Sequence, residues 1–406
     1  MKNKGHVLAD INRPAHGQTK VPHAMIDSPL FLKTFGITRV GDVTDLDVIG
    51  MPVWFATRPN SRGLSVSQGK GMTAERAKLS AIMEAIEGAV AEDTQRHVSE
   101  YGSIFEMRGR GSDVLPLKTI SRVIFEKFDP VRERAWVKGH SARDDRVVMA
   151  PFELVGLDFR VDFPWDRDAF VMSSQGLAAG FDFDQVVLHA MLELIENEAC
   201  TMVEAFSTRM TATRPVFFPK GQFADLDGLV DRLDALGLTP TFFDLTGSTG
   251  VPVILASLPR PLMTDNGPGQ RSAAGIACRL SGAEAACSAL QEAIQARLTH
   301  ISGARDDLFD DRYKADEDIR GKGRGGGSAM QWKHSLVLPN SGRNVPAWRK
   351  LAEHLFSCGV NDLYLFRLET DYPDIVVVRV LGNGMTTATA SQTNLSPAAL
   401  ASFLGA

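Results

Sequence analysis

The sequence predicts a mixed α/β fold, and three observations support this class. Apolar segments with strand-like patterns alternate along the chain with segments of helical spacing. Three glycine-rich stretches each precede an acidic helical segment. The acidic segments resemble one another, so we expect one unit, a glycine loop followed by an acidic helix, to occur three times. Because no acidic segment makes a site alone, we expect the copies to pack with mixed β-sheets as a single domain around a central site.

The expected elements follow from these patterns in chain order. Strands are expected where β-branched and aromatic residues alternate or run together, and Ile49–Gly50 is expected to turn the first two. The expected strands are 37–47, 51–57, 133–140, 146–157, 170–174, 239–245, 251–258, 362–368 and 374–380. Helices are expected where apolar residues recur at helical spacing, with Thr73 as the N-cap of the first. The expected helices are 73–92, 184–206, 225–236, 282–302 and 348–358.

Two segments are expected to be held loosely. Residues 1–27 are polar and are expected to form a flexible N-terminal arm before a domain at 28–406. Residues 308–333 are charged and then glycine-rich. A mobile surface loop is favoured there over a phosphate-binding loop, because no strand pattern precedes the glycines and no apolar helix pattern follows them.

The acidic segments form an internal repeat. Ser80–Glu87, His189–Glu196 and Ser288–Gln295 align without a gap. Each has a glutamate at its centre, and a second acid or amide follows three residues later. Positions three and four apart share a face of a helix, so each pair forms one polar stripe. The pairs are Glu84 with Glu87, Glu193 with Glu196, and Glu292 with Gln295.

The acids are flanked by short side chains, which favours a binding face over a solvated one. The alternative is an amphipathic helix with its acids in water, but such a face usually carries Lys, Arg and more Glu. Short neighbours let another group approach the helix closely. The flanking residues are Ala77, Ala81, Gly88 and Ala91 in the first copy, Ala190, Asn197 and Cys200 in the second, and Ala285, Ala289, Ala296 and Thr299 in the third.

Convergence of the three faces would place five carboxylates in one pocket and would require cations. Like charges at short range raise the pKa of one another, and a buried unpaired carboxylate opposes folding by several kcal/mol. All-oxygen ligands suit Mg²⁺, which keeps waters and commonly bridges to phosphates. The glycine stretches at 67–71, 173–180 and 272–275 are then interpreted as loops whose N–H groups hold phosphate oxygens, with Lys70 adding charge. These features together predict a site for a nucleotide and magnesium.

Composition excludes several other classes. The formal net charge of −5 gives no basic footprint for nucleic acid. The four cysteines form no C-x-x-C pair, so neither a zinc site nor a disulfide framework is indicated, and a reducing cytoplasm is expected. The first 27 residues contain no apolar signal core, and no run of eighteen apolar residues occurs, so no membrane span is expected.

The motifs resemble those of the YcaO family from about residue 28 to 380. The resemblance rests on Gly36–Gly50, Gly69–Gly71 followed by Ser80, Glu84 and Glu87, Ser174–Gly180 with Glu193 and Glu196, and Glu292–Arg297 with Ser302–Asp307. It implies a YcaO-like domain and an ATP-dependent enzyme that phosphorylates the oxygen of a peptide backbone amide, which a nucleophile then replaces. A side-chain nucleophile gives an azoline, whereas a sulfide donor gives a thioamide.

The resemblance also implies roles for individual residues. Five glutamates are expected to hold magnesium and the ATP phosphates: Glu84, Glu87, Glu193, Glu196 and Glu292. Of these, Glu84, Glu193 and Glu292 are expected to be catalytic. The residues expected to contact the nucleotide are Ser67, Gly69, Lys70, Ser80, Ser174, Gln295, Arg297 and Arg305.

The sequence departs from the family pattern at four positions. Gly88 and Asn197 stand where an arginine usually follows the second glutamate, Gln175 replaces an asparagine, and Ser288 replaces an arginine. Phosphate contacts are therefore expected from other cations, with Lys70, Arg271, Arg297 and Arg305 as the candidates.

Three functions remain open at this point. The chain lacks the proline-rich C-terminus and the fused peptide-recognition domain of azoline-forming members, so it resembles members that install thioamides with a separate TfuA-like protein. The second is an azoline-forming cyclodehydratase of a ribosomal peptide pathway. The third is a non-catalytic nucleotide-binding scaffold that presents a peptide, which the lost arginines favour. The expected partners are a precursor peptide or protein, a TfuA-like protein and, from the resemblance, a second copy of the chain.

Overall fold

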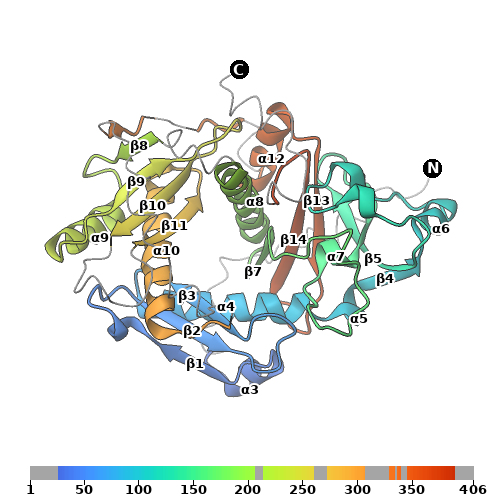
Figure 1. Cartoon of the computed structure of the whole chain (residues 1–406), viewed down its shortest axis with the longest axis horizontal. Helices are drawn as coiled ribbons and strands as arrows, with labels where there is room; N and C mark the ends of the chain where they lie inside the picture. Colours follow the sequence, from blue (N-terminus) through green and yellow to red (C-terminus); the bar gives the residue numbers. More distant parts are fainter. Residues whose placement is uncertain are drawn as a thin grey trace. The chain divides into compact units, whose positions relative to one another are not determined.

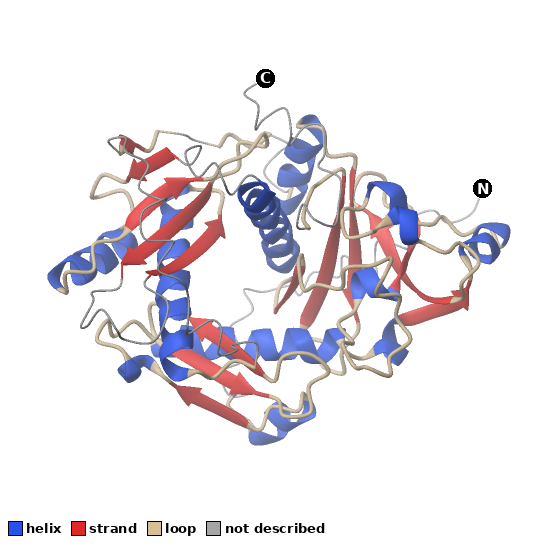
Figure 2. Cartoon of the chain, in the orientation of Figure 1, coloured by secondary structure: helices blue, strands red, loops and turns tan. Residues whose placement is uncertain are grey.

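The structure is a computed structural model that describes residues 26–205, 214–259, 272–306, 329–333, 336–339 and 345–388. Helices and strands are mixed throughout these residues (Figure 2), which confirms the expected mixed α/β class. The arm expected at 1–27 lies outside the described residues except for residues 26–27. The loop expected at 308–333 lies outside them except for residues 329–333.

The chain groups into two compact units. The first unit comprises residues 1–35, 86–194 and 338–385, and the second comprises residues 36–85, 195–337 and 386–406. Two of the boundaries fall within the helices α4 (Ala74–Ala91) and α8 (Phe183–Ala205). Each of these helices therefore contributes residues to both units. The single domain expected at 28–406 stays a prediction.

The first unit contains a six-stranded sheet. Its strands run in the order β4-β5-β13-β14-β7, with β6 paired to β5, and all pairs are antiparallel (Figure 1). All eight residues of β14 are buried, and Arg379 is among them. The strands are β4 (Val98–Gly102), β5 (Arg134–Ser141), β6 (Val147–Pro151), β7 (Leu177–Gly180), β13 (Asp362–Leu368) and β14 (Val376–Asn383).

Short helices complete the first unit. Trp348, near the start of α12, donates its indole N–H to Asp184 Oδ1 at 2.7 Å and so ties this helix to the start of α8. The α-helices are α3 (Pro29–Thr34), α5 (Thr94–His97), α6 (Ile104–Gly109), α7 (Phe152–Val155) and α12 (Ala347–Ser357). The 3-10 helices are η2 (Leu117–Thr119) and η3 (Phe125–Lys127).

The second unit contains two sheets. An antiparallel sheet is formed by β1 (Arg39–Asp42), β2 (Val53–Thr57) and β3 (Val66–Lys70), with η1 (Thr44–Leu46) after β1. The other sheet has the order β11-β10-β9-β8-β12, in which only the β8–β12 pair is parallel among the described strands. Its strands are β8 (Arg214–Phe217), β9 (Thr241–Asp244), β10 (Val253–Pro259), β11 (Ser272–Cys278) and β12 (Met330–Gln331).

One apolar core joins the elements of the second unit. The helix α10 (Gly282–Ser302) packs along β10 and β11 and contacts α9 (Ala224–Ala235) (Figure 1). Val53, Leu233 and Leu290 are fully buried in this core, which therefore draws residues from β2, α9 and α10. At the edge of the core, Trp332 stacks on Phe218 with ring centroids 5.8 Å apart. The indole of Trp332 also lies against Gly282, where an added Cβ would come within 2.2 Å of it.

The glycine stretches at 67–71 and 272–275 are mainly strands, which corrects the expectation of loops there, whereas the stretch at 173–180 is a loop and turn that becomes a strand at Leu177. The strand β3 leads into α4, β7 into α8, and β11 into α10. Two of the glycines allow a strand to lie directly on a helix backbone. A Cβ on Gly69 would stand 2.0 Å from the nitrogen of Ala81, and one on Gly275 would stand 2.3 Å from the carbonyl oxygen of Ala289. Close backbone packing explains these two glycines.

Most expected elements occur, and the exceptions have local causes. The first strand pair forms with Gly50 at φ 66°, but the strand expected at 37–47 covers only Arg39–Asp42 and gives way to η1. The Oγ1 of Thr73 accepts the N–H of Arg76, as an N-cap does. The strand expected at 170–174 is wrong. Phe170 forms only an isolated bridge to Val123, and the strand begins at Leu177, after the turn at Gly176 (φ 73°). The strand expected at 146–157 ends at Pro151, because the chain turns into α7.

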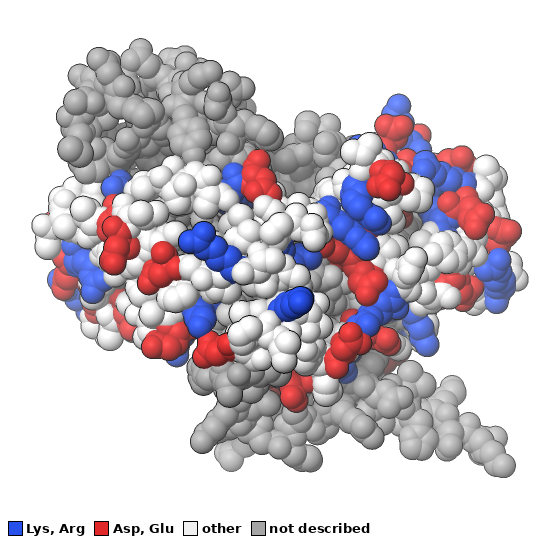
Figure 3. Space-filling model, turned by 90° about the horizontal axis from the view of Figure 1, so that it is seen from below, with Lys and Arg blue, Asp and Glu red and all other residues white. Residues whose placement is uncertain are grey.

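The surface of the described residues carries both signs of charge. On the face drawn in Figure 3, Lys and Arg side chains are interspersed with Asp and Glu side chains. Among the described helices, none combines the length and the apolar character that a membrane crossing needs.

Candidate functional site

Three of the expected acids belong to the second unit and share cationic neighbours. Glu84 lies on α4, Glu196 on α8 and Glu292 on α10. The Nζ of Lys70, at the end of β3, lies 3.4 Å from Oε2 of Glu292. Lys70 also acts electrostatically on Glu84 and Glu196. The structure therefore brings these three acids into range of one lysine.

Main-chain N–H groups hold two of these acids in place. Oε2 of Glu196 accepts the N–H of Cys278 at 3.1 Å, at the end of β11. The N–H of Gln68 in β3 donates to Glu84. Glu196 is thus bound to the end of β11, which leads into α10, and Glu84 to the middle of β3, which leads into its own helix α4. The close packing at Gly69 brings β3 near enough to α4 for the second of these bonds.

The surroundings of these acids disfavour their ionised forms. Desolvation raises the pKa of Glu84 to about 7, although Lys70 and Arg305 act in the opposite direction. The side chain of Glu84 is nevertheless exposed at its tip, so it does not lie in a sealed core. Burial and the nearby charge of Glu292 raise the pKa of Glu196 to about 8. Additional positive charge at this position would stabilise both carboxylates.

The other two acids belong to the first unit and face two buried arginines. Glu87 lies on α4 and Glu193 on α8. Both act electrostatically on Arg379 of β14, and Glu193 also acts on Arg122. The five acids are therefore divided between the two units, three in the second and two in the first. Their convergence on one pocket remains a proposal.

Arg297 is paired with an acid outside the expected five. Its guanidinium makes two hydrogen bonds to the carboxylate of Asp47, at 2.6 and 3.0 Å, and so ties α10 to the segment after β1. This pairing restrains Arg297 in a structural contact. Arg271, a further candidate for the missing cations, lies outside the described residues.

Arg305 does lie within electrostatic range of Glu84. Gly303 ends α10 in the left-handed conformation at φ 60°, which turns the chain at the helix end as a C-cap does. Asp306 then accepts both the N–H and the hydroxyl of Ser65, each at 2.8 Å. The segment after α10 is therefore fixed to the residue that precedes β3.

The remaining expected contacts occupy strands, helices and one loop. Ser67 and Gly69 lie in β3, and Ser80 lies in α4 beside Gly69. Ser174 is exposed before β7 in the first unit. The Oε1 of Gln295 is buried without a hydrogen-bond partner. An unpartnered acceptor at this position is consistent with a missing donor or cation.

The donor set fits magnesium better than a metal with many protein ligands. Among the described residues, no three His, Cys, Asp or Glu side chains are grouped closely enough to hold one ion. Mg²⁺ is typically bound through one or two carboxylates and keeps waters and phosphate oxygens as its other ligands. Carboxylates with raised pKa values that a ligand can still reach, such as the exposed Glu84 and the partly buried Glu196, suit that mode of binding.

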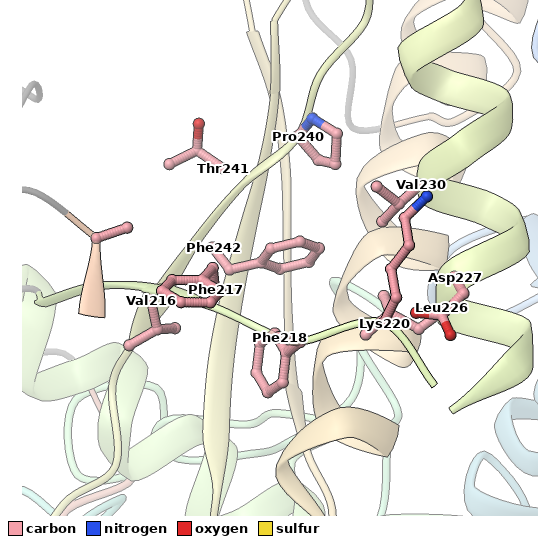
Figure 4. Close-up of a pocket in the computed structure, with 11 residues that line it drawn as sticks. Val216, Phe217, Phe218, Lys220, Leu226, Asp227, Val230, Pro240, Thr241 and Phe242 are labelled. Carbon is pink, nitrogen blue, oxygen red and sulfur yellow. The ribbon is translucent and has the colours of Figure 1, made fainter. Parts of the chain in front are cut away.

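A separate cavity of about 340 Å³ occurs in the second unit. It lies between α9 and the strands β8 and β9, and Figure 4 shows the rings of Phe217, Phe218 and Phe242 beside it. Lys220 and Asp227 are the charged residues of its lining. None of the expected site residues lines this cavity.

Comparison with known proteins identifies the family. A family model described as YcaO cyclodehydratase, ATP- and Mg²⁺-binding, matches residues 68–386. The chain belongs to the YcaO family. This result confirms the family expected from the motifs, and the expected cofactors, ATP and Mg²⁺, are those by which the family is described.

Individual proteins are similar to this chain in sequence or in fold. An uncharacterised protein in the tfuA 3′ region of Rhizobium leguminosarum bv. trifolii is 36% identical over 282 residues, which cover 68% of this YcaO chain and 65% of the relative. The structure of YcaO from Methanopyrus kandleri bound with AMPPCP and Mg²⁺ matches with a TM-score of 0.68 and 21% identity, over 90% of this chain and 91% of that one. A heterocyclase in complex with substrate and cofactor matches with a TM-score of 0.68 and 16% identity, over 92% and 53% of the two chains.

Sequence reasoning missed several groups that surround the acids of this YcaO protein. Gln68 and Cys278 act through the main chain, which no side-chain pattern reveals. Arg279 acts electrostatically on Glu196 but stands outside the repeats. Arg379 had a visible signal, because it is the one charge in the apolar run Ile375–Leu381. Arg122 had no comparable signal.

Proposed function

We propose that this YcaO protein uses Mg-ATP to phosphorylate the oxygen of a peptide backbone amide, and that a sulfur nucleophile then displaces the phosphate to give a thioamide. The observation that carries the proposal is the group of Glu84, Glu196 and Glu292 around Lys70, in which two carboxylates have raised pKa values. Such carboxylates are suited to hold cations, and the cations in turn attract a triphosphate.

The residues have distinct roles in this proposal. Five glutamates are the proposed magnesium ligands: Glu84, Glu87, Glu193, Glu196 and Glu292. Bound Mg²⁺ supplies charge neutralisation and Lewis acidity during phosphoryl transfer. Lys70, which already lies 3.4 Å from Glu292, has further N–H donors for a phosphate oxygen. Arg305 adds positive charge beside Glu84. Ser67, Ser80, Ser174 and Gln295 are the proposed polar contacts to the nucleotide.

The amide chemistry proceeds in two steps. The amide oxygen forms a bond to the γ-phosphorus of ATP while the bond to ADP breaks. A sulfur nucleophile then adds to the amide carbon, and phosphate leaves with the original oxygen. The thioamide outcome is favoured by the 36% identical relative, which is described by its position beside tfuA. A TfuA-like protein is accordingly the proposed partner.

An azoline-forming cyclodehydratase is the second candidate. The description of the family as a cyclodehydratase and the match to a heterocyclase favour it. In that reaction the nucleophile is a Cys, Ser or Thr side chain of the peptide, and the amide oxygen again leaves with phosphate. The two candidates share the nucleotide site and differ in the source of the nucleophile.

Mass spectrometry of the peptide product tests the proposal. The protein is incubated with Mg-ATP, sulfide and a peptide encoded beside its gene, with and without a TfuA-like protein. Thioamide formation adds ~16 Da for each oxygen replaced by sulfur, whereas azoline formation removes ~18 Da as water. A gain that needs both ATP and sulfide supports the first candidate, and a sulfide-independent loss supports the second.

Two further outcomes would contradict enzymatic activity. If the protein binds Mg-ATP but neither consumes it nor alters the peptide, the non-catalytic scaffold becomes the better description. If it does not bind Mg-ATP, the role given to the five glutamates is wrong. A matched reaction with Asp231→Asn serves as a control for mutant preparations. Asp231 lies on α9 and forms an exposed ion pair with Lys220, away from the expected site residues.

A further inference from the structure

Two arginines of the first unit are buried side by side without a hydrogen-bonded carboxylate. Arg122 is 2% exposed and Arg379 is fully buried. Arg122 donates to the carbonyl oxygens of Ser173 and Leu154, at 3.2 and 2.5 Å. Arg379 donates to those of Val155 and Gln175, at 3.0 and 2.7 Å. The Nη2 of Arg379 is buried and has no hydrogen-bond partner.

This arrangement opposes folding, so it needs another explanation. Burying a charge is unfavourable unless an opposite charge compensates it, and each guanidinium disfavours the charge of the other. The buried Arg134 of the same unit shows the usual solution, since it bonds to Asp166 at 2.8 Å. The opposite charges that act on Arg122 and Arg379 are Glu193 and Glu87.

The two arginines also fix the second glycine stretch. The carbonyls of Ser173 and Gln175 both belong to it, and Val380, next to Arg379, donates its N–H to Gly176 at 2.7 Å. The stretch therefore lies against β14 with its carbonyl groups turned toward the guanidinium groups. Its position before α8 then follows from contacts with Arg122 and Arg379.

The expected acids of each unit lie within electrostatic range of cations of the same unit. In the first unit, Glu193 acts on Arg122 and Arg379, and Glu87 acts on Arg379. In the second unit, Lys70 acts on Glu84 and Glu196 and lies 3.4 Å from Glu292, while Arg305 acts on Glu84 and Arg279 on Glu196. Arg122 and Arg379 do not reach solvent and so do not contact a ligand directly. Their charge acts through the acids and the glycine stretch.

We propose that Arg122 and Arg379 are positioning residues that hold the second glycine stretch and offset the negative charge of Glu87 and Glu193 in the first unit. The inference rests on the proposed nucleotide site. In this role the charge of the buried pair makes it easier for an anionic triphosphate to bind near these two carboxylates. The pair acts through its charge and through the glycine stretch, without direct contact with phosphate.

The charge of the pair has opposite effects on two ligands, which separates this role from a structural one. A buried cation repels Mg²⁺ added alone and attracts the triphosphate. Arg379→Gln keeps a donor for the carbonyl of Gln175 but removes the charge, whereas Arg379→Lys keeps the charge. We expect Arg379→Gln to bind Mg²⁺ alone more tightly and a non-hydrolysable ATP analogue at saturating Mg²⁺ more weakly, each by roughly tenfold. Arg379→Lys should stay within about threefold of the wild type for both.

Calorimetric titration of the whole chain with each ligand provides the test. Arg143→Gln is the matched control, because Arg143 also donates to two carbonyl oxygens of the first unit, those of Val360 and Asn361, which lie outside the second glycine stretch. If Arg379→Gln does not fold, Arg122→Gln is titrated instead, and the same changes in the affinities for Mg²⁺ and for the ATP analogue are expected. The inference is overturned if both affinities fall together in the Gln variants, or if Arg379→Lys is as defective as Arg379→Gln. If the wild type itself binds neither ligand, the proposed nucleotide site fails, and the inference fails with it.

Discussion

Replacing Gly69 with alanine should disrupt the contact between β3 and α4. An ideal Cβ at this position would stand 2.0 Å from the nitrogen of Ala81 and 2.3 Å from the carbonyl oxygen of Ala77. Ordinary contacts lie at 3.4 Å or beyond, so the strand and the helix must separate by roughly 1 Å. Both neighbours are main-chain atoms of a helix, which cannot move aside as a flexible side chain can.

The expected loss of stability follows from this geometry. Overpacking a well-packed core usually destabilises by about 1–3 kcal/mol, and occasionally by more. We expect Gly69→Ala to reach about 3 kcal/mol, because the clash involves backbone on both sides. The displacement also carries the N–H of Gln68 and the ammonium of Lys70 away from Glu84 and Glu292, so affinity for Mg-ATP should fall as well.

Urea denaturation followed by circular dichroism measures the first effect, and calorimetric titration with Mg-ATP measures the second. Gly228→Ala is the matched control, because Gly228 lies on the exposed face of α9 with nothing within 4 Å of an added Cβ. It should stabilise by about 0.5–1 kcal/mol, as glycine to alanine does in a helix interior. A Gly69→Ala protein as stable as the wild type would refute the close approach of strand and helix.

Three further changes test other parts of the site. Glu193→Gln should abolish ATP consumption and reduce stability slightly, since Arg122 and Arg379 lose one opposing charge; unchanged turnover would remove Glu193 from the site. The pKa of Glu196 lies at about 8 in the folded protein instead of 4.5, so the folded state binds a proton that the unfolded state releases, and the free energy of unfolding falls as pH rises between these values. Glu196→Gln should flatten that fall in metal-free denaturation curves. A pH dependence identical to that of the wild type would contradict the raised pKa. Asp306→Ala should lower the free energy of unfolding by about 1 kcal/mol, because it removes two hydrogen bonds to Ser65, and a loss no larger than that of Asp231→Ala would argue against this contact.

The sequence predicted the acidic helices well because their signals are local. Helical spacing placed α4, α8 and α10 within a residue or two, and Thr73 was recognised as a cap from its side chain. The family followed from motif order, which needs no knowledge of packing. The mixed α/β class followed from the alternation of apolar patterns.

Errors arose where long-range contacts decide the conformation. The stretch at 67–71 has the composition of a loop, yet Val66–Lys70 pairs with β2 along its whole length. Glycine at this position allows the strand to lie close to the backbone of a helix. Composition alone does not distinguish that role from phosphate binding. Arg297 illustrates the same limit, because its partner Asp47 lies 250 residues away in the sequence. The buried pair of Arg122 and Arg379 likewise depends on β14 lying beside the second glycine stretch.

The stacking of Trp332 gives the protein an optical probe of its own. The indole lies against Gly282, the first residue of α10, and Glu292 follows about 15 Å further along the same helix. Tryptophan emission depends on the polarity around the ring, so loosening of this helix end would shift the spectrum without any attached label. Replacing the other four tryptophans with phenylalanine would leave a single emitter for stopped-flow experiments with nucleotide and peptide.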